Sequence, residues 1–371
     1  RPAHELAADL GDTVVPEGIG GHEALRLFTQ VMVPATRAQD NPMNLAYVPA
    51  APTEASLVFD LAVSAAEMFA GTWEAGAGAI AAENQALAWL AALAGWPDTA
   101  GGCFVSGATM GNLSALVAGR ERARDRGLGP GPSGRWRLAA TGDAHSSVRA
   151  AARVMDCDVL EVAADERGRM TGDALAAVLD AAAGADGGSG VFAVVASAGT
   201  TNSGVVDDLS GVADVCRERG LWLHVDGAYG GAALVAPSVA HLFAGIEHAD
   251  SFVVDPHKWL FAPYDCCALL YQEPEHGMAA HSQFADYLEM VDRAEWNPAD
   301  LAVHLTRRAR GLPFWFSLAT HGTDRYREAV ETVLATTRTV VDEVRARDHL
   351  ELVMEPDLSV VLLERVGWEM A

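Results

Sequence analysis

Cationic side chains are scarce in this chain of 371 residues, and the shortage excludes two classes of partner. Lysine and arginine together number 26, against 50 aspartate and glutamate residues, so the formal net charge is −24. A nucleic-acid-binding protein needs a basic surface to meet phosphates, and anionic membranes attract basic segments. We therefore expect neither nucleic acid nor a membrane as partner, and we interpret the acidity as that of a solvated surface.

Cysteine is also scarce, and its five copies follow no disulfide or metal-ligand pattern. They are odd in number, scattered, and in no CxxC spacing: Cys103, Cys157, Cys216, Cys266 and Cys267. The sequence therefore predicts neither a disulfide framework nor a metal site. Unpaired thiols fit a reducing compartment, so we expect a cytoplasmic protein.

Long apolar runs are missing too. No segment has the roughly 18 uninterrupted apolar residues that suggest a membrane-spanning helix, and residues 1–10 lack the basic-then-apolar order of a signal peptide. Apolar residues nevertheless make up 50% of the chain and charged residues 20%, a balance typical of globular proteins. A chain of this length has room for two or three domains.

The chain divides into three parts that differ in their residue pattern. Residues 1–52 are punctuated by prolines and predict a helix or two followed by an extended arm. In residues 53–275 short apolar segments alternate with helical ones, which predicts an α/β domain with a mostly parallel central sheet and flanking helices. Residues 276–371 predict an irregular segment, helices and strand fragments, a small α+β domain that looks incomplete. The expected strands of the sheet are residues 137–140, 159–162, 191–197, 221–226, 251–255 and 267–271.

The chemistry of such a sheet gathers at the carboxyl ends of its strands, and five polar, glycine-flanked clusters stand at strand or helix ends. One cluster, residues 255–259, places Lys258 next to His257 in an apolar stretch. Lysines in apolar surroundings tend to have lowered pKa values and to act as nucleophilic amines towards carbonyl cofactors. Taken alone, Lys258 is equally an ordinary surface lysine after a strand.

A second cluster, residues 224–231, contains Asp226 at the end of an apolar strand, followed by glycines. A carboxylate there can keep a pyridine nitrogen protonated, and glycines admit a flat ligand close to the backbone. Asp226 precedes Lys258 by 258 − 226 = 32 residues, room for one helix and a return strand, so both can reach one sheet edge. Alone, such an aspartate is more often a turn or cap residue.

The remaining clusters supply other parts of a cofactor site. Residues 106–112 precede an apolar helix and have the glycine, threonine and helix start of a phosphate cradle, without a dinucleotide or P-loop pattern. His145, within residues 143–147, could stack on a flat ring, and residues 198–204 form a polar turn. Each has a plain alternative as a cap, a core histidine or a loop. Together, the clusters predict a phosphate cradle, a stacking ring, an acid and an amine.

In this order, the clusters SGATMGN, DAHSS, SAGTT, HVDGAYGG and DPHKW resemble the group II pyridoxal-phosphate-dependent amino-acid decarboxylases, which include the aromatic L-amino-acid, glutamate and tyrosine types. The likeness runs from about residue 41 to residue 315. It implies the fold-type-I transferase architecture, with residues 53–275 as the large cofactor-binding domain and residues 276–371 as mobile loop and partial C-terminal domain. It also implies a homodimer with active sites at the subunit interface.

The resemblance implies roles for individual residues. Lys258 would carry pyridoxal phosphate as a Schiff base, Asp226 would pair with the pyridine nitrogen, and His145 would stack on the ring; these three are the expected catalytic residues. The further expected cofactor contacts are Ala108, Thr109, Ser197, Ala228, Asp255 and His257, with Asp255 standing where many members have Asn or Ser. The positions that match residues lining the family's substrate pocket are Tyr47, Ala50 and Trp73.

The implied reaction converts an L-amino acid to its amine and CO₂. We expect an aromatic or other neutral substrate, because no arginine is clearly placed for a side-chain carboxylate. The family's mobile loop usually offers a tyrosine that protonates the substrate carbon after CO₂ leaves, whereas the aligned position holds Leu301 or Pro298, and the nearest tyrosine is Tyr287. The open alternatives are aldehyde-forming decarboxylation with oxidative deamination, a carbon–carbon lyase on the same scaffold, and a catalytically degenerate cofactor-binding subunit.

Overall fold

The computed structural model describes residues 1–39, 41–45, 47, 48, 51–131, 133–183, 189–283 and 295–367. The chain forms two compact units, Arg1–Pro49 and Ala50–Ala371. The described residues of the first unit form the helices α1 (Ala3–Leu10), α2 (Gly21–Leu27) and α3 (Val33–Ala35), with the π-helical turn η1 (Phe28–Met32) between the last two. Leu27 is the one buried residue among those described in this unit, so the unit encloses almost no core of its own.

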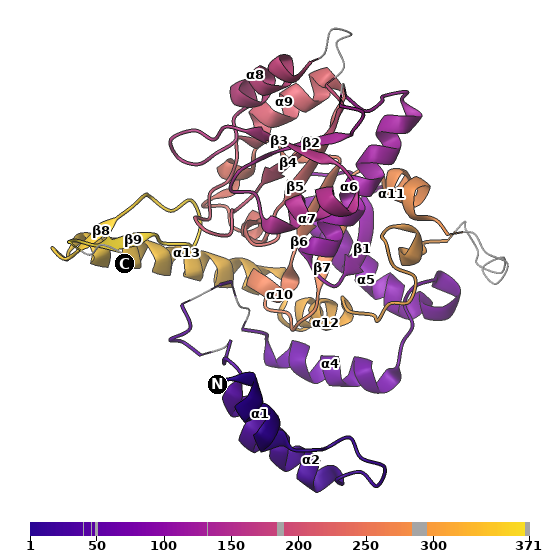
Figure 1. Ribbon diagram of the computed structural model, residues 1–371, viewed down its shortest axis with the longest axis vertical. Helices are drawn as coiled ribbons and strands as arrows, with labels where there is room; N and C mark the ends of the chain where they lie inside the picture. The colour runs from indigo at the N-terminus through magenta and orange to yellow at the C-terminus, as the bar shows by residue number, and fades with distance from the viewer. Residues whose placement is uncertain are drawn as a thin grey trace. The chain divides into compact units, whose positions relative to one another are not determined.

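The second unit is built on a seven-stranded sheet with the order β1-β7-β6-β5-β4-β2-β3. Strand β7 runs antiparallel to both of its neighbours, and the pairs among β2 to β6 are parallel. The prediction of a mostly parallel α/β sheet is therefore confirmed (Figure 1). The strands are β1 (Gly101–Val105), β2 (Arg137–Thr141), β3 (Asp158–Val162), β4 (Val191–Ser197), β5 (Trp222–Asp226), β6 (Ser251–Val254) and β7 (Cys267–Tyr271).

Strand β1 is the element of the sheet that the sequence did not reveal. It begins with two glycines, which are depleted in strands and leave no side chain to read as a pattern. The glycine is needed here, because a Cβ on Gly102 would lie 1.8 Å from the carbonyl oxygen of Leu269 in the neighbouring strand.

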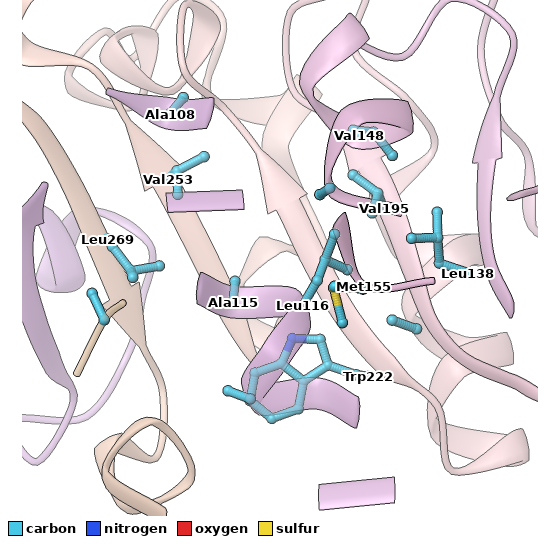
Figure 2. Close-up of a cluster of buried hydrophobic side chains, with 14 of the residues drawn as sticks. Ala108, Ala115, Leu116, Leu138, Val148, Met155, Val195, Trp222, Val253 and Leu269 are labelled. Atoms are coloured by element: carbon cyan, nitrogen blue, oxygen red, sulfur yellow. The ribbon is translucent and has the colours of Figure 1, made fainter. Parts of the chain in front are cut away.

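Helices cover the sheet and enclose its core. Helix α6 (Ala108–Asp125) contacts β4 to β7, with α7 (Ser146–Val154) and α11 (Pro274–His281) beside it. Figure 2 shows α6 residues such as Leu116 facing Trp222 of the sheet. A Cβ on Gly119 would lie 2.7 Å from the Trp222 ring, so the small residue permits this close packing. The other helices of the unit's first part are α4 (Glu54–Ala66), α5 (Trp73–Leu93), α8 (Gly172–Ala182), α9 (Leu209–Arg219) and α10 (Pro256–Trp259), with 3-10 turns η2 (Gly230–Val235), η3 (Ala240–Phe243) and η4 (Ile246–His248).

The C-terminal part carries a helix pair and a two-stranded sheet. The first helix of this pair begins only at Leu312, because the preceding residues are held elsewhere, Arg307 by a buried ion pair and Arg308 in a bridge to Phe69. Among the described residues, no helix is both long enough and apolar enough to cross a membrane. The elements are η6 (Pro298–Asp300), α12 (Leu312–His321), α13 (Thr323–Arg345), β8 (Leu350–Leu352) and β9 (Leu363–Arg365).

Candidate active site

A cavity of about 280 Å³ opens where β4, β5 and β6 reach their carboxyl ends. Parallel strands bring their carboxyl ends to one edge of the sheet, and loops there carry the functional groups. The structure brings together at this cavity every predicted cofactor contact: Ala108, Thr109, His145, Ser197, Asp226, Ala228, Asp255, His257 and Lys258. Segments as far apart as residues 108 and 258 therefore form a single site.

Of the three predicted substrate contacts, Trp73 is not among the described residues that line the cavity. Tyr47 belongs to the first compact unit, and Ala50 lies outside the described residues. Trp73 begins α5, where its backbone N–H donates to Asn297 Oδ1 at 2.9 Å. A substrate role for these three residues stays a prediction.

The Lys258 amine lies beside a buried carboxylate. Its Nζ is 2.9 Å from Asp255 Oδ2, and the Asp255 side chain is 2% exposed. Burial by itself lowers the pKa of Lys258, but the neighbouring Asp255 carboxylate outweighs it and the net pKa is raised. The expectation of a lowered lysine pKa was therefore wrong, because the apolar sequence around Lys258 does not show the carboxylate that faces it.

The second neighbour of the Asp255 carboxylate is His257. His257 Nδ1 accepts the backbone N–H of Cys266 at 3.0 Å, so a neutral ring carries its hydrogen on Nε2, which lies 3.5 Å from Asp255 Oδ2. Burial lowers the pKa of His257, and this favours the neutral ring. The remaining oxygen of Asp255, Oδ1, is buried without a hydrogen-bond partner in the described part of the chain. The carboxylate thus faces Lys258 and His257.

Asp226 is held by hydrogen bonds to both of its oxygens. The backbone N–H of Ala228 donates to Oδ1 at 3.1 Å, and the side-chain amide of Asn112 donates to Oδ2 at 2.8 Å. Strand β5 ends at Asp226, so the carboxylate stands at the sheet edge that the sequence indicated. The side chain is fixed as an acceptor.

His145 is the N-cap residue of α7. Its Nδ1 accepts the backbone N–H of Ser147 at 3.2 Å and lies 2.8 Å from the Ser147 hydroxyl. The alternative that His145 is a capping residue is therefore correct, and the ring lines the cavity as well. The cap fixes the ring without removing it from the site.

The N-terminus of α6 forms another wall of the cavity. Ser106, Gly107, Ala108 and Thr109 line it where β1 ends and this 18-residue helix starts. The first backbone N–H groups of a helix have no partner within the helix, and the helix dipole makes this end favourable for anions. With the Thr109 hydroxyl nearby, the arrangement suits a phosphate group.

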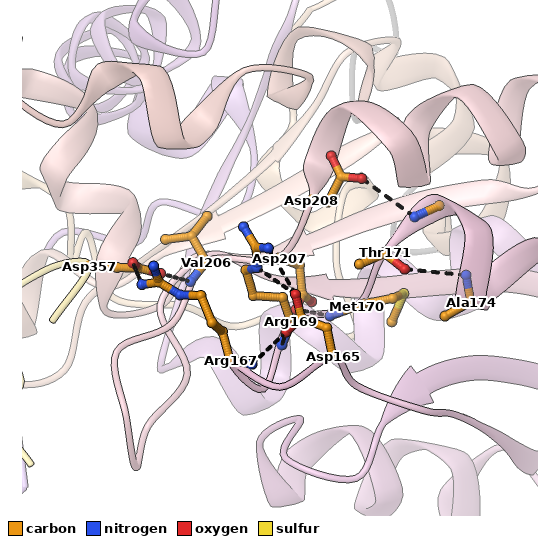
Figure 3. A network of polar contacts seen from close by, with 11 residues as sticks. Asp165, Arg167, Arg169, Met170, Thr171, Ala174, Val206, Asp207, Asp208 and Asp357 are labelled. Carbon is orange, nitrogen blue, oxygen red and sulfur yellow. Dashed lines mark hydrogen bonds and ion pairs between the residues drawn. The ribbon is translucent and has the colours of Figure 1, made fainter. Parts of the chain in front are cut away.

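The wall at the end of β4 is supported from behind by a buried carboxylate, Asp207. Asp207 accepts the backbone N–H of Ser197 at 2.7 Å and that of Met170 at 2.7 Å, and burial raises its pKa to about 7. Figure 3 shows the polar network around it, in which Asp357 accepts from the backbone of Val206 and pairs with Arg167. The C-terminal segment therefore supports the loop that lines the cavity.

Sequence reasoning missed two aromatic residues at this site. Tyr264 lines the cavity, is 58% exposed, and has its ring 4.9 Å from that of His257. Tyr229 stacks on Trp259 at 5.3 Å and hydrogen-bonds Ser359 through its hydroxyl. For Tyr229 the available signal was its place in the motif that holds Asp226, whereas Tyr264 lies beyond the motif that holds Lys258.

The positions aligned with the family's loop tyrosine do not line the cavity. Leu301 is 0% exposed, with its carbonyl accepting from the Tyr271 hydroxyl at 3.1 Å, and Pro298 is buried in a 3-10 turn. The nearest tyrosine in the sequence, Tyr287, lies outside the described residues. These two buried positions therefore supply no phenol.

Comparison with known proteins is consistent with this geometry. The chain matches the pyridoxal-dependent decarboxylase conserved domain over residues 23–364. It is 29% identical to the aromatic-L-amino-acid decarboxylase of Bacillus atrophaeus, over 99% of this chain and 76% of that protein. It is 34% identical to the cysteine sulfinic acid decarboxylase of Rattus norvegicus, over 74% of this chain but only 57% of that protein.

Solved structures of similar fold point to the same family. The crystal structure of Oryza sativa TDC with PLP and tryptamine has a TM-score of 0.90 at 27% identity, covering 98% of this chain and 77% of that one. That of Rhodiola rosea 4-hydroxyphenylacetaldehyde synthase has a TM-score of 0.87 at 25% identity, covering 98% and 78%. The chain belongs to the pyridoxal-dependent decarboxylase family and is a pyridoxal-phosphate-dependent amino-acid decarboxylase.

Proposed function

We propose that this enzyme decarboxylates an aromatic or other neutral L-amino acid to the corresponding amine. The observation that carries the proposal is the lining of the cavity. Among the described residues that line it there is no arginine, and its basic side chains are His145, His257 and Lys258, all assigned to the cofactor. An acidic substrate side chain would lack a cation of its own, whereas the Tyr264 ring offers an apolar face to an aromatic one.

Pyridoxal phosphate fits the donor set of this cavity. The N-terminus of α6, with Thr109 and His257, would hold the phosphate, Asp226 would hold the pyridine nitrogen, and His145 would lie against the ring. Lys258 would bind the aldehyde carbon. When bound, pyridoxal phosphate supplies an electron-withdrawing ring that takes up the electron pair left on the substrate carbon when CO₂ departs.

The chain's own residues hold the charges that this chemistry needs. Asp226, fixed by two hydrogen bonds, would keep a proton on the pyridine nitrogen. Asp255 would receive the Lys258 ammonium when the substrate amine releases that lysine, since its Oδ2 already lies 2.9 Å from Nζ. Both aspartates are almost fully buried, and their interactions are strong because little water screens them.

We further propose that the enzyme works as a homodimer. Helix α4 exposes several large apolar side chains, and the first unit exposes more of them. Exposed apolar patches on a folded protein indicate interaction sites, and a second copy of the chain is the partner that the family resemblance implies. The exposed residues are Leu57, Val58 and Leu61 on α4, with Leu25, Phe28, Met32 and Val33 in the first unit. Analytical ultracentrifugation of the holoenzyme tests this, and a monomer at working concentrations contradicts it.

We also propose that the enzyme is cytoplasmic. All five cysteines are unpaired and buried, which fits the reducing cytoplasm. Fractionation of the source cells with an antibody against the chain tests this location.

The substrate proposal is tested by assaying CO₂ release from a panel of the common amino acids. We expect turnover of aromatic or neutral substrates, with the amine as product, and no turnover in Lys258→Ala. Preference for aspartate, glutamate or cysteine sulfinic acid contradicts the proposal. Reduction with borohydride should attach the cofactor covalently to Lys258, and the site assignment fails if Lys258 stays unmodified.

One observation favours a second product. The aligned loop positions Pro298 and Leu301 are buried and are not tyrosines, and one solved structure similar to this chain is an aldehyde synthase by its name. In that reaction the amino acid, O₂ and water give the aldehyde, CO₂, ammonia and hydrogen peroxide. Measuring amine, aldehyde and peroxide in the same assay separates the two reactions.

A further inference from the structure

A single buried amide lies behind the cavity and contacts two different parts of it. Asn112 is on α6, is 0% exposed, and does not line the cavity itself. Its Nδ2 lies 2.8 Å from Asp226 Oδ2 and 2.9 Å from the Ser147 hydroxyl, and its Oδ1 lies 2.9 Å from His224 Nε2. Both amide hydrogens and the amide oxygen are therefore in use.

The orientation of the Asn112 amide follows from the chemistry of its partners. An ionised carboxylate can only accept hydrogen bonds, so the nitrogen must face Asp226 and the oxygen must face His224. A flipped amide would bring two oxygens together at 2.8 Å in a fully buried position, which is unfavourable. Asp226 therefore determines which way Asn112 points.

His224 supports the same orientation from the other side. Burial lowers the pKa of His224 to about 4, so the ring is neutral and has one hydrogen. That hydrogen is on Nε2, which donates to Asn112 Oδ1. Nδ1 then accepts from the Ser251 hydroxyl at 2.8 Å, and Ser251 in turn accepts from Trp222 Nε1 at 2.8 Å. The chain of donors runs in one direction, from Trp222 to Asp226.

A branch of the same network reaches His145. Because Asn112 donates to the Ser147 oxygen, the Ser147 hydroxyl hydrogen is available for His145 Nδ1 at 2.8 Å. The backbone N–H of Ser147 points at the same nitrogen. His145 Nδ1 is thus an acceptor, and the hydrogen of the neutral ring is on Nε2.

We infer that Asn112 is a positioning residue that couples the two cofactor-facing groups of this site, fixing Asp226 as a hydrogen-bond acceptor and directing the Ser147 hydroxyl to His145 Nδ1. The inference rests on the assignment of Asp226 and His145 to the cofactor. Asn112 touches neither substrate nor cofactor and acts through these two side chains. Residues that orient direct ligands in this way commonly change affinity or activity by 10-fold or more when they are replaced.

The test uses Asn112→Asp in the full-length protein, because aspartate has the shape of asparagine and lacks the two donor hydrogens. We expect the dissociation constant for pyridoxal phosphate, measured by titrating cofactor-depleted protein, to rise by roughly 10-fold or more. We also expect the pH dependence of the bound cofactor's absorbance to change. In histidine-selective ¹⁵N NMR, the His145 Nδ1 signal should shift because the Ser147 hydroxyl is no longer directed to it, with His145→Asn used to assign the signal.

Two further variants separate the branches and keep the test decisive if Asn112→Asp folds poorly. Ser147→Ala removes one of the two donors to His145 Nδ1, so it should shift the His145 Nδ1 signal and leave the cofactor dissociation constant within about twofold. His224→Gln should weaken cofactor binding and leave the His145 signal as in the native protein. The matched control is Ser114→Ala, which removes a buried polar group of the same helix that bonds Val303 instead; it should change neither readout.

The inference is overturned if Asn112→Asp, or both branch variants, match the native protein in cofactor affinity and in the His145 signal while only thermal stability falls. Asp226→Ala and His145→Asn distinguish this from failure of the site assignment. If those two variants also bind the cofactor normally, the assignment of Asp226 and His145 to the cofactor is what has failed.

Discussion

The Nζ of Lys258 lies 2.9 Å from Oδ2 of Asp255, a carboxylate that is itself buried. The two residues are three apart in the sequence and sit on either side of the turn that starts α10. The pair favours the ammonium form of Lys258 at the point where the proposed chemistry needs an amine.

Replacing Asp255 with asparagine should lower the pKa of Lys258, because the carboxylate that raises it is removed while the burial that lowers it remains. We expect the pH midpoint of cofactor attachment to Lys258 to shift downward. Borohydride trapping across a pH series on cofactor-depleted protein measures this. Asp60→Asn, which removes a partly exposed carboxylate paired with Arg308, should leave the midpoint where it is; an unchanged midpoint in Asp255→Asn contradicts the prediction.

The ion pair between Arg307 and Glu83 should be costly to break. Both side chains are buried, with nitrogen–oxygen distances of 2.8 and 2.9 Å, and Glu83 also accepts the backbone N–H of Gly311 at 2.8 Å. Glu83→Gln leaves a guanidinium buried without a counter-charge, so we expect the free energy of unfolding to fall by about 3–5 kcal/mol. Urea unfolding measures it.

An exposed pair provides the comparison for that value. Arg325 and Glu328 are 2.7 Å apart on the surface of α13, where solvent screens the charges. Glu328→Gln should therefore change the free energy of unfolding by less than about 1 kcal/mol. Equal losses in Glu328→Gln and Glu83→Gln would mean that burial is not what makes the Glu83 pair important.

The sheet and the site residues were predictable from sequence for the same reason. Strands such as β4 are continuous apolar runs that end in polar residues, so the pattern shows both the strand and the place where function begins. Strand β1 was not predicted because its packing requires Gly102. Glycine has no side chain, so it adds nothing to a hydrophobic pattern in the sequence.

Contacts between distant segments were not predictable. Asn112 was within a recognised motif, yet its partners Asp226 and Ser147 are 114 and 35 residues away, and only the fold brings them together. The raised pKa of Lys258 depends likewise on where the Asp255 carboxylate points. Local sequence indicates which residues are available, and tertiary geometry decides their protonation states.

The C-terminal segment should contribute to the order of the cavity wall. Asp357 Oδ2 accepts the backbone N–H of Val206 at 3.2 Å (Figure 3), and Leu358 packs against Gly199 and Gly230. Asp357→Ala leaves that N–H without its acceptor, so we expect a loss of about 1–3 kcal/mol in unfolding free energy and faster amide exchange over residues 199–206, measured by mass spectrometry. The control is Arg167→Gln, which removes only the partly exposed partner of Asp357; faster exchange in both variants alike would assign the effect to the ion pair.

Two buried groups should give opposite dependences of stability on pH. Burial lowers the pKa of His224 from 6.5 to about 4. Its contribution to the free energy of unfolding is therefore present above pH 6.5 and is lost as pH falls through about 4. Burial raises the pKa of Asp207 from 3.8 to about 7. Its contribution to the free energy of unfolding is therefore present below pH 3.8 and is lost as pH rises through about 7. Between about pH 4 and 6.5 the two slopes oppose each other, each at most about 1.4 kcal/mol per pH unit.

Single variants should expose each slope. In Asp207→Asn the free energy of unfolding should rise more steeply with pH across this window than in the native protein, because the opposing contribution is gone. In His224→Gln it should rise less steeply or fall. Urea unfolding at several pH values measures both, and the difference between the variants is the informative quantity because all other titrating groups are common to them. If the two variants show the same slope, neither side chain has the shifted pKa, because contributions of opposite sign can be equal only when both are zero.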